Sequence, residues 1–151
     1  MIGQATLLDG KARFTGPREV TVQTADGEVT VRGTTVVVGT GTVPARPDIS
    51  GIDLPGVDDS TTIQHADPFP KRLAVVGGGS VGMEFANMFA RFGAEVTLLH
   101  AGSKLLPDAE PVVAQSVTDA LTATGINVRT DAKVEQIASA GSGLQLSLIH
   151  I

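Results

Sequence analysis

A glycine-rich turn between two apolar runs constrains this fold more than any other stretch of the sequence. The turn covers residues 77–82 and follows 73–76, a short β-branched run typical of a buried strand in a parallel sheet. Apolar side chains then recur at helical spacing over residues 80–92, and residues 94–99 return to an apolar β-branched run. Strand, glycine turn, helix and strand within about thirty residues predict a right-handed βαβ unit.

The three glycines at Gly77, Gly79 and Gly82 have the spacing G-x-G-x-x-G, which suits a dinucleotide site. The first permits a tight turn, the second lets a pyrophosphate approach the backbone, and the third lets the helix pack closely on the strand. The unpaired N–H groups of the first helical turn favour a phosphate there. A glycine-rich turn of an ordinary α/β domain is the alternative. The candidate pyrophosphate-binding residues are Gly77, Gly78, Gly79, Ser80, Val81 and Gly82.

The composition argues against several other functions. A formal net charge of −5 and 3% aromatic residues provide neither the basic surface nor the stacking side chains of a nucleic-acid-binding protein. No run approaches the roughly twenty apolar residues of a membrane span, and the first residues do not resemble a signal peptide. The chain has no Cys, hence no disulfide and no thiolate metal ligand. We expect a cytoplasmic protein without a nucleic-acid partner, a membrane partner or a metal site.

Residues 1–42 are predicted to be β structure. The alternating run 20–24 and its return at 29–32 predict a hairpin. Residues 35–38 form a β-branched run that ends at the Gly-Thr-Gly of 39–41, which is typical of a buried strand whose end approaches something closely. A hairpin and one strand are too little to close a core, so we expect this segment to be the end of a larger domain.

Residues 43–70 contain five prolines and are predicted to be a stiff linker. Within it, Asp58, Asp59 and Ser60 suit the cap of one short helical turn, and His65 is expected on the surface.

The remainder of the chain continues the α/β pattern. Residues 108–124 predict a second helix, in which Pro111 suits the first turn. Residues 126–129 predict a third strand, and 134–137 and 144–148 predict a hairpin.

The order of these motifs resembles the FAD-dependent pyridine nucleotide–disulfide oxidoreductases, the family that includes dihydrolipoamide dehydrogenase, glutathione reductase and mercuric reductase. The likeness extends from about Gly10 to Leu148. Ser80 stands where glutathione reductases resemble one another in carrying a tyrosine, so the chain is more similar to the dihydrolipoamide dehydrogenase and mercuric reductase branches. The matching segments are Gly39–Gly41, the prolines Pro44 and Pro47, Pro70–Leu73, Gly77–Ala86, Phe92–Leu99 and Leu105–Pro107.

The resemblance implies a flavoprotein whose domains are interrupted in sequence. Residues 1–42 would be the C-terminal remnant of an FAD-binding domain, residues 43–70 the linker, and residues 71–151 a truncated NAD(P)-binding domain. The fold class is then α/β: a Rossmann-like domain with a parallel sheet and a β-hairpin, preceded by the β-rich remnant.

The same resemblance implies further site residues. Glu84 matches a helix glutamate near the nicotinamide end of the cofactor, although a carboxylate in a first helical turn also gains from the helix dipole. Val134 matches a residue on the adenine side. The residues that would lie against the FAD are Ala12, Thr40, Gly41 and Thr42.

His100 departs from the fingerprint, which places an acid for the adenosine ribose, or a nearby Arg for a 2′-phosphate, at the end of the second strand. An imidazole does not repel a 2′-phosphate, and Lys104 is near enough in sequence to assist, which favours NADP. Gly82 favours NAD, because alanine often accompanies NADP specificity at that position in related folds. The choice between NAD and NADP stays open, as does an exposed and inert His100.

The family's chemistry passes hydride from NAD(P)H to FAD and on to a Cys pair, which serves a small-molecule or disulfide substrate. This chain has no Cys, and a C-terminal dimerisation domain would lie outside it, so we expect the parent to be a homodimer and the fragment to be inactive. Two alternatives remain: a flavoprotein without a disulfide, such as an NADH oxidase or ferredoxin reductase, and a non-enzymatic NAD(H)-sensing module.

Overall fold

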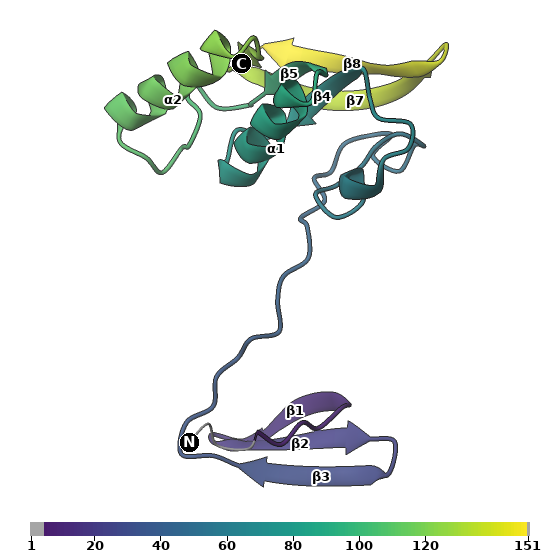
Figure 1. Cartoon of the computed structure of the whole chain (residues 1–151), viewed down its shortest axis with the longest axis vertical. Coiled ribbons are helices and arrows are strands. Elements are labelled where there is room, and N and C mark those ends of the chain that lie inside the picture. The colour runs from purple at the N-terminus through teal and green to yellow at the C-terminus, as the bar shows by residue number, and fades with distance from the viewer. Residues whose placement is uncertain (1–4, 151) are drawn as a thin grey trace. The chain divides into compact units, whose positions relative to one another are not determined.

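The computed structural model describes residues 5–150 and divides the chain into two compact units, residues 1–42 and residues 43–151. The first unit is an antiparallel sheet in the order β1-β2-β3 (Figure 1). Its strands are β1 (Lys11–Gly16), β2 (Glu19–Thr24) and β3 (Gly27–Arg32). The predicted hairpin is therefore the β2–β3 pair, and a third strand joins its other edge.

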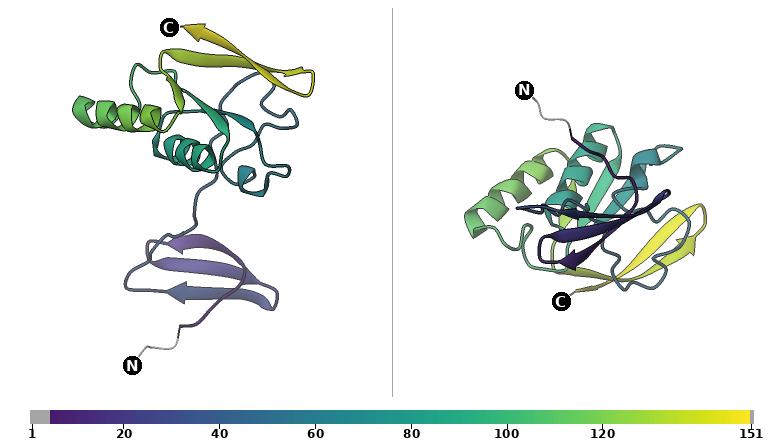
Figure 2. Two further views of the ribbon diagram at one scale, coloured as in Figure 1. Left: turned by 45° about the horizontal axis from the view of Figure 1, so that its top comes forward. Right: turned by 90° about the horizontal axis from the view of Figure 1, so that it is seen from below.

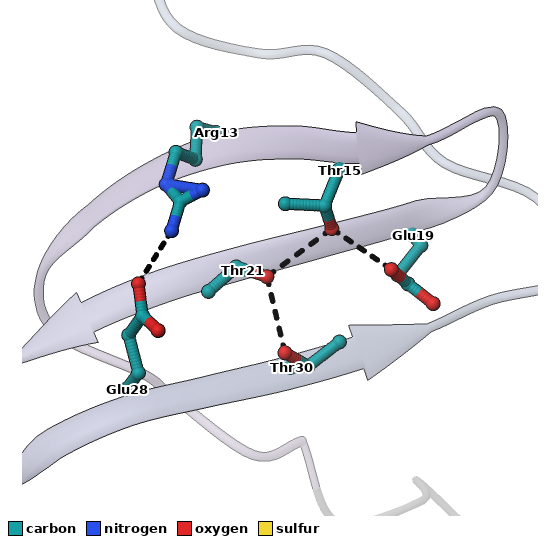
Figure 3. A network of polar contacts seen from close by, with 6 residues as sticks. All are labelled: Arg13, Thr15, Glu19, Thr21, Glu28 and Thr30. Carbon is teal, nitrogen blue, oxygen red and sulfur yellow. Dashed lines mark hydrogen bonds and ion pairs between the residues drawn. The ribbon is translucent and has the colours of Figure 1, made fainter.

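One face of this sheet is polar and carries a hydrogen-bonded ladder (Figure 3). The hydroxyl groups of Thr15, Thr21 and Thr30, one from each strand, are linked at 3.1 and 3.0 Å. Thr15 also donates to Glu19 at 3.0 Å, and Arg32 donates to the same carboxylate at 2.6 Å. These bonds lower the pKa of Glu19, with the Arg32 guanidinium the larger cause and the Thr15 hydroxyl the next.

The other face is apolar, because side chains along each strand alternate between the two faces. Val22 in the central strand is buried, whereas Phe14 and Val31 in the outer strands are 57% and 45% exposed. Among the described residues, this apolar face is therefore buried at its centre and exposed at its outer strands. The residues that share it are Ala12, Phe14, Val20, Val22, Val29 and Val31.

The prediction of a strand at residues 35–38 is wrong. No described strand pairs with this run, and Val37 and Val38 are 86% and 65% exposed. A β-branched run forms a strand only where a neighbouring strand accepts its hydrogen bonds, and residues 5–33 supply none.

The second unit contains a parallel sheet in the order β4-β5-β6, with a helix in each connection (Figures 1 and 2). This is the predicted βαβ unit followed by the predicted second helix and third strand, and the expected α/β fold class is confirmed. The elements are β4 (Arg72–Val76), α1 (Ser80–Arg91), β5 (Glu95–Leu99), α2 (Pro111–Ala123) and β6 (Asn127–Arg129). The second helix starts at Pro111, later than the sequence predicted.

A two-stranded antiparallel hairpin, β7 (Ala132–Ala140) and β8 (Gly143–His150), follows the parallel sheet. It corresponds to the predicted hairpin but is longer at both ends.

The central strand β5 serves two apolar cores, because its alternate side chains point to opposite faces. Val96 and Leu98 pack in a core with Phe89 of α1 and Leu121 of α2. Leu99 belongs instead to a second core with the hairpin. The helices therefore cover one face of the sheet and the hairpin meets the other.

The segment predicted as a linker, 43–70, is part of the second unit and packs on it. Ser50 forms a parallel bridge with Gln136, and its carbonyl oxygen accepts the N–H of Ile137 at 2.8 Å. Ile49 is buried in the hairpin core. A short 3₁₀ helix, η1 (Ile63–His65), lies within the segment and leaves the side chain of His65 exposed, as predicted.

The side-chain cap predicted for this helical turn is not formed, because the N-cap residue of η1 is Thr62 and no side chain caps it. Asp59 instead lies in the turn that precedes η1. Its carboxylate accepts the N–H groups of Thr61 and Thr62 at 2.8 and 3.1 Å, and these bonds lower its pKa.

Candidate functional site

The glycine turn joins β4 to α1 with two close backbone contacts. Gly77 has a φ of +121°, a conformation that L side chains rarely adopt, and its N–H donates to the carbonyl oxygen of Leu99 at 2.8 Å. A Cβ atom at Gly82 would lie 2.0 Å from the carbonyl oxygen of Gly77. The outer glycines of the motif therefore have the conformational and packing roles that the sequence predicts.

The first turn of α1 presents unpaired N–H groups beside open space. Gly79 caps the helix with an extended backbone, and its carbonyl oxygen accepts the N–H of Met83 at 3.1 Å. Within residues 5–150, the N–H groups of Ser80, Val81 and Gly82 have no hydrogen-bond partner. A Cβ atom at Gly79 would meet nothing within 4 Å. The arrangement leaves three donors next to an opening that an anion can enter.

Gly78, by contrast, is buried and bonded on both sides. Its N–H donates to Nδ1 of His100 at 3.2 Å, and its carbonyl oxygen accepts the N–H of Leu106 at 2.9 Å. A Cβ atom at this position would lie 2.5 Å from Leu105 and 2.8 Å from the His100 ring. The loop after β5 therefore packs directly on the middle of the glycine turn.

The far nitrogen of His100 is an unusual feature of the site. Because Nδ1 accepts a hydrogen bond, the ring hydrogen is on Nε2, and this atom is buried without a partner among the described residues. Gly102 lies beside it, since a Cβ atom there would be 3.0 Å from Nε2. A buried donor without a partner costs about 1–3 kcal/mol, so the ring's orientation carries an energetic penalty.

A cavity of 340 Å³ opens beside the turn, at the carboxyl ends of β4 and β5. It includes Gly77, His100 and Val134, three residues that the sequence places in the site, and it also includes Lys133 and Ile49. Sequence reasoning missed the last two. The one available signal for Ile49 was an apolar residue within a proline-rich segment.

Residues 3–150 match the family model for pyridine nucleotide-disulphide oxidoreductases. The chain belongs to this family. It is 34% identical to a probable pyridine nucleotide-disulfide oxidoreductase, RclA, from Escherichia coli over 145 residues, which cover 95% of this chain and 33% of the relative. It is 40% identical to a mercuric reductase from Shigella flexneri over 134 residues, which cover 88% of this chain and 24% of that enzyme.

The solved structures agree with this family membership. The HOCl-induced flavoprotein disulfide reductase RclA from Escherichia coli matches with a TM-score of 0.75 and 34% identity, over 95% of this chain and 33% of that one. A water-forming NADH oxidase from Lactobacillus brevis, solved with NADH, shares the fold with a TM-score of 0.67 at 23% identity, over 91% of this chain and 33% of that one. The chain thus spans about a quarter to a third of the length of these relatives.

Within this family fold, Glu84 is not in the first turn of α1, contrary to the sequence expectation. The helix begins at Ser80, so Glu84 is its fifth residue, and the first turn contains no acidic side chain. Glu84 is exposed. The stabilisation expected from the helix dipole falls off within that first turn, so it does not explain this glutamate.

Lys104 does not extend toward solvent near the turn. Its Nζ donates to the carbonyl oxygen of Ala109 and is part-buried, so the ammonium group tethers the loop between β5 and α2.

The residues that the resemblance places against FAD belong to the first unit. Ala12 is exposed on β1, on the apolar face of the sheet. Thr40, Gly41 and Thr42 are also exposed, and Gly41 has a φ of +74°. Their contact with FAD stays a prediction.

Two further features bear on the site. A second hollow of 440 Å³ lies between η1 and α1 and is lined mainly by apolar side chains such as Phe69, Phe85 and Phe92.

In the part of the chain that the structure describes, no cluster of three or more His, Cys, Asp or Glu residues could hold a metal ion, and no helix has the length and apolar character to cross a membrane.

Proposed function

We propose that residues 71–150 bind the pyrophosphate of NAD or NADP at the glycine turn. The supporting observation is that the N–H groups of Ser80, Val81 and Gly82 have no partner in residues 5–150 and stand beside the open space at Gly79. Backbone donors at a helix N-terminus stabilise a phosphate through hydrogen bonds and the helix dipole.

The surroundings of the turn fit such a ligand. The first turn of α1 contains no acidic side chain that would compete with an anion. The adjacent cavity of 340 Å³ falls within the range of about 300–1,000 Å³ that is usual for ligand pockets. It lies outside the carboxyl ends of parallel strands, where α/β sheets bind nucleotides.

For the whole protein we propose an FAD-dependent oxidoreductase. In it, residues 1–42 complete an FAD-binding domain through Ala12 and Thr40–Thr42, and 43–70 lead to the NAD(P)-binding domain. Bound NAD(P)H would supply a hydride to FAD, and FAD would in turn reduce a redox-active disulfide. This chain does not contain the Cys pair of that disulfide. Val134 and His100 line the adenosine side of the cavity, and Glu84 lies toward the nicotinamide end. We further propose a cytoplasmic homodimer that acts on a small-molecule or disulfide substrate.

Family membership favours this assignment over the NAD(H)-sensing module, because the match spans both units. A flavoprotein without a disulfide, of the NADH oxidase or ferredoxin reductase kind, is the remaining alternative. A Cys pair in the sequence upstream of this chain would decide for the disulfide reductase, and its absence there would decide against it.

Nucleotide binding by the 151-residue chain tests the proposal. The chain has no Trp or Tyr, so the emission of NADH or NADPH can be followed without protein tryptophan background. We expect binding by the wild type and at least about tenfold weaker binding by Gly79→Val, whose side chain enters the open space, because hydrogen bonds to a charged group are lost.

Gly143→Val is the matched control. Its Cβ atom also meets nothing within 4 Å, and it lies at the start of β8 rather than in the turn. Binding to neither nucleotide by the wild-type chain, or equal binding by Gly79→Val and the wild type, would contradict the proposal.

A further inference from the structure

We propose that His100 is a positioning residue for the dinucleotide site, acting through its hydrogen bond with the N–H of Gly78. This inference rests on the proposed function. The dinucleotide fingerprint places an acid at this position. Restraint of the glycine turn by His100 is not part of that fingerprint.

The glycine turn divides sharply into bonded and unbonded donors. The N–H of Gly77 is held by Leu99 at 2.8 Å, and the N–H of Gly78 is held by His100 at 3.2 Å. From Ser80 to Gly82 the N–H groups have no partner within the described chain. The His100 bond is thus the last hydrogen bond that an N–H group of the turn donates before the donors that face the anion, and it restrains the peptide between Gly77 and Gly78.

The carbonyl side of Gly78 is restrained by the same loop. Leu106 donates its N–H to that oxygen at 2.9 Å, and it does so with a φ of +49°, which is uncommon for a residue other than glycine. A locally unfavourable backbone conformation of this kind persists when surrounding contacts hold it in place. His100 and Leu106 therefore hold Gly78 from both sides.

The residue at position 78 shows that this contact is built into the sequence. The G-x-G-x-x-G spacing leaves position 78 unspecified, yet here it is glycine. A Cβ atom there would lie 2.8 Å from Cγ and 3.0 Å from Cβ of His100. The backbone fixes the position of Cβ, and Cγ can move only by a rotation about the Cα–Cβ bond that would take the ring away from the Gly78 N–H. A glycine therefore lets the ring reach the turn.

The ring contributes an acceptor as well as shape. Its Nε2 is buried without a partner among the described residues, so an apolar side chain in its place would remove an unsatisfied donor. The hydrogen bond to Gly78 is the feature that an apolar side chain cannot reproduce.

Two substitutions separate the acceptor from the shape. In His100→Asn the side-chain oxygen stands as many bonds from the backbone as Nδ1 and can accept the Gly78 N–H. His100→Leu has a similar branched outline and no acceptor. A role in packing alone predicts that the leucine variant behaves as well as the asparagine variant or better.

The experiment measures two quantities on the full 151-residue chain: the dissociation constants of NADH and NADPH, and the hydrogen-exchange rate of the Gly78 amide by NMR without nucleotide. We expect His100→Asn to stay within about twofold of the wild type in both. We expect His100→Leu to bind about three- to tenfold more weakly and its Gly78 amide to exchange faster by a similar factor. The Gly77 amide, bonded to Leu99, serves as the internal control and keeps its protection in all three proteins.

The two measurements separate this inference from the proposed function. Wild-type affinity in His100→Leu, or equal losses in the leucine and asparagine variants, overturns the positioning role. Unchanged Gly78 exchange in His100→Leu overturns the restraint itself. Failure of the wild type to bind either nucleotide overturns the proposed function and with it the positioning of a nucleotide, while the exchange rates still decide whether His100 restrains Gly78.

Discussion

The carbonyl oxygen of Gly77 lies where a side chain at Gly82 would begin, with a Cβ atom there only 2.0 Å away. The first turn of α1 therefore rests on the backbone of the strand-to-helix turn. Because the obstructing atom is backbone, it cannot move aside as a flexible side chain could.

The substitution Gly82→Ala is expected to destabilise the chain. Alanine improves helix propensity by about 1 kcal/mol, but overpacking costs about 1–3 kcal/mol and here meets backbone, so the clash prevails. Denaturant unfolding checks the change in free energy. Gly79→Ala is the control, since its Cβ atom meets nothing within 4 Å and its φ of −81° suits any residue. A more stable Gly82→Ala protein would contradict the close approach.

Replacing His100 by an acid is expected to change the choice between cofactors. In His100→Glu the carboxylate can accept a hydrogen bond from the adenosine ribose and repels a 2′-phosphate, so the ratio of NADPH to NADH dissociation constants rises. Titration of both nucleotides, with His65→Glu as a control at an exposed position of η1, checks this. An unchanged ratio would place His100 away from the ribose even if it still restrains Gly78.

Much of the second unit could be predicted from the sequence, because its signals are local. The change from β-branched runs to helical spacing locates β4, α1 and β5, and Gly93 ends α1 with a φ of +95°. The contact between Gly78 and His100 has no such signal, since it joins residues 22 positions apart.

Two other expectations failed, each for a different reason. Residues 35–38 have strand propensity but no partner strand among the described residues. Glu84 was placed in the first turn of α1, but the helix starts at Ser80, as predicted, and a turn holds only about 3.6 residues, so its fifth residue lies in the second turn.

The chain alone is expected not to transfer hydride. It has no Cys to accept electrons, and the proposed reaction needs two bound cofactors. Mixing the chain with FAD and NADH or NADPH and following the reduction of a dye checks this, with FAD and the nucleotide in the absence of protein as the control. Dye reduction above the control rate, proportional to the chain concentration, would show that this chain alone is catalytically sufficient.

Glu19 is expected to titrate below the usual range of a glutamate, because Arg32 and Thr15 donate to its carboxylate. Its lowered pKa stabilises the folded chain at neutral pH, and this stabilisation disappears as the pH falls through the native pKa. The free energies of unfolding of the wild type and Glu19→Gln should therefore converge as the pH falls below the native pKa of Glu19.

NMR titration of the Glu19 carboxyl group measures this pKa directly. Arg32→Met should raise it more than Thr15→Val, since the guanidinium is the larger cause. The reverse order would contradict the assignment of causes.

Leu98 and Leu99, neighbours in β5, are expected to affect different parts of the second unit. Leu98 is fully buried in the core with α1 and α2, and Leu99 is 4% exposed in the core with the hairpin. Each substitution by alanine should lower the free energy of unfolding by about 2–5 kcal/mol, through lost burial and the cavity left behind. Amide exchange distinguishes them: Leu98→Ala should raise rates first in α1 and α2, and Leu99→Ala first in β7 and β8. Identical exchange patterns would mean that the two cores unfold as one.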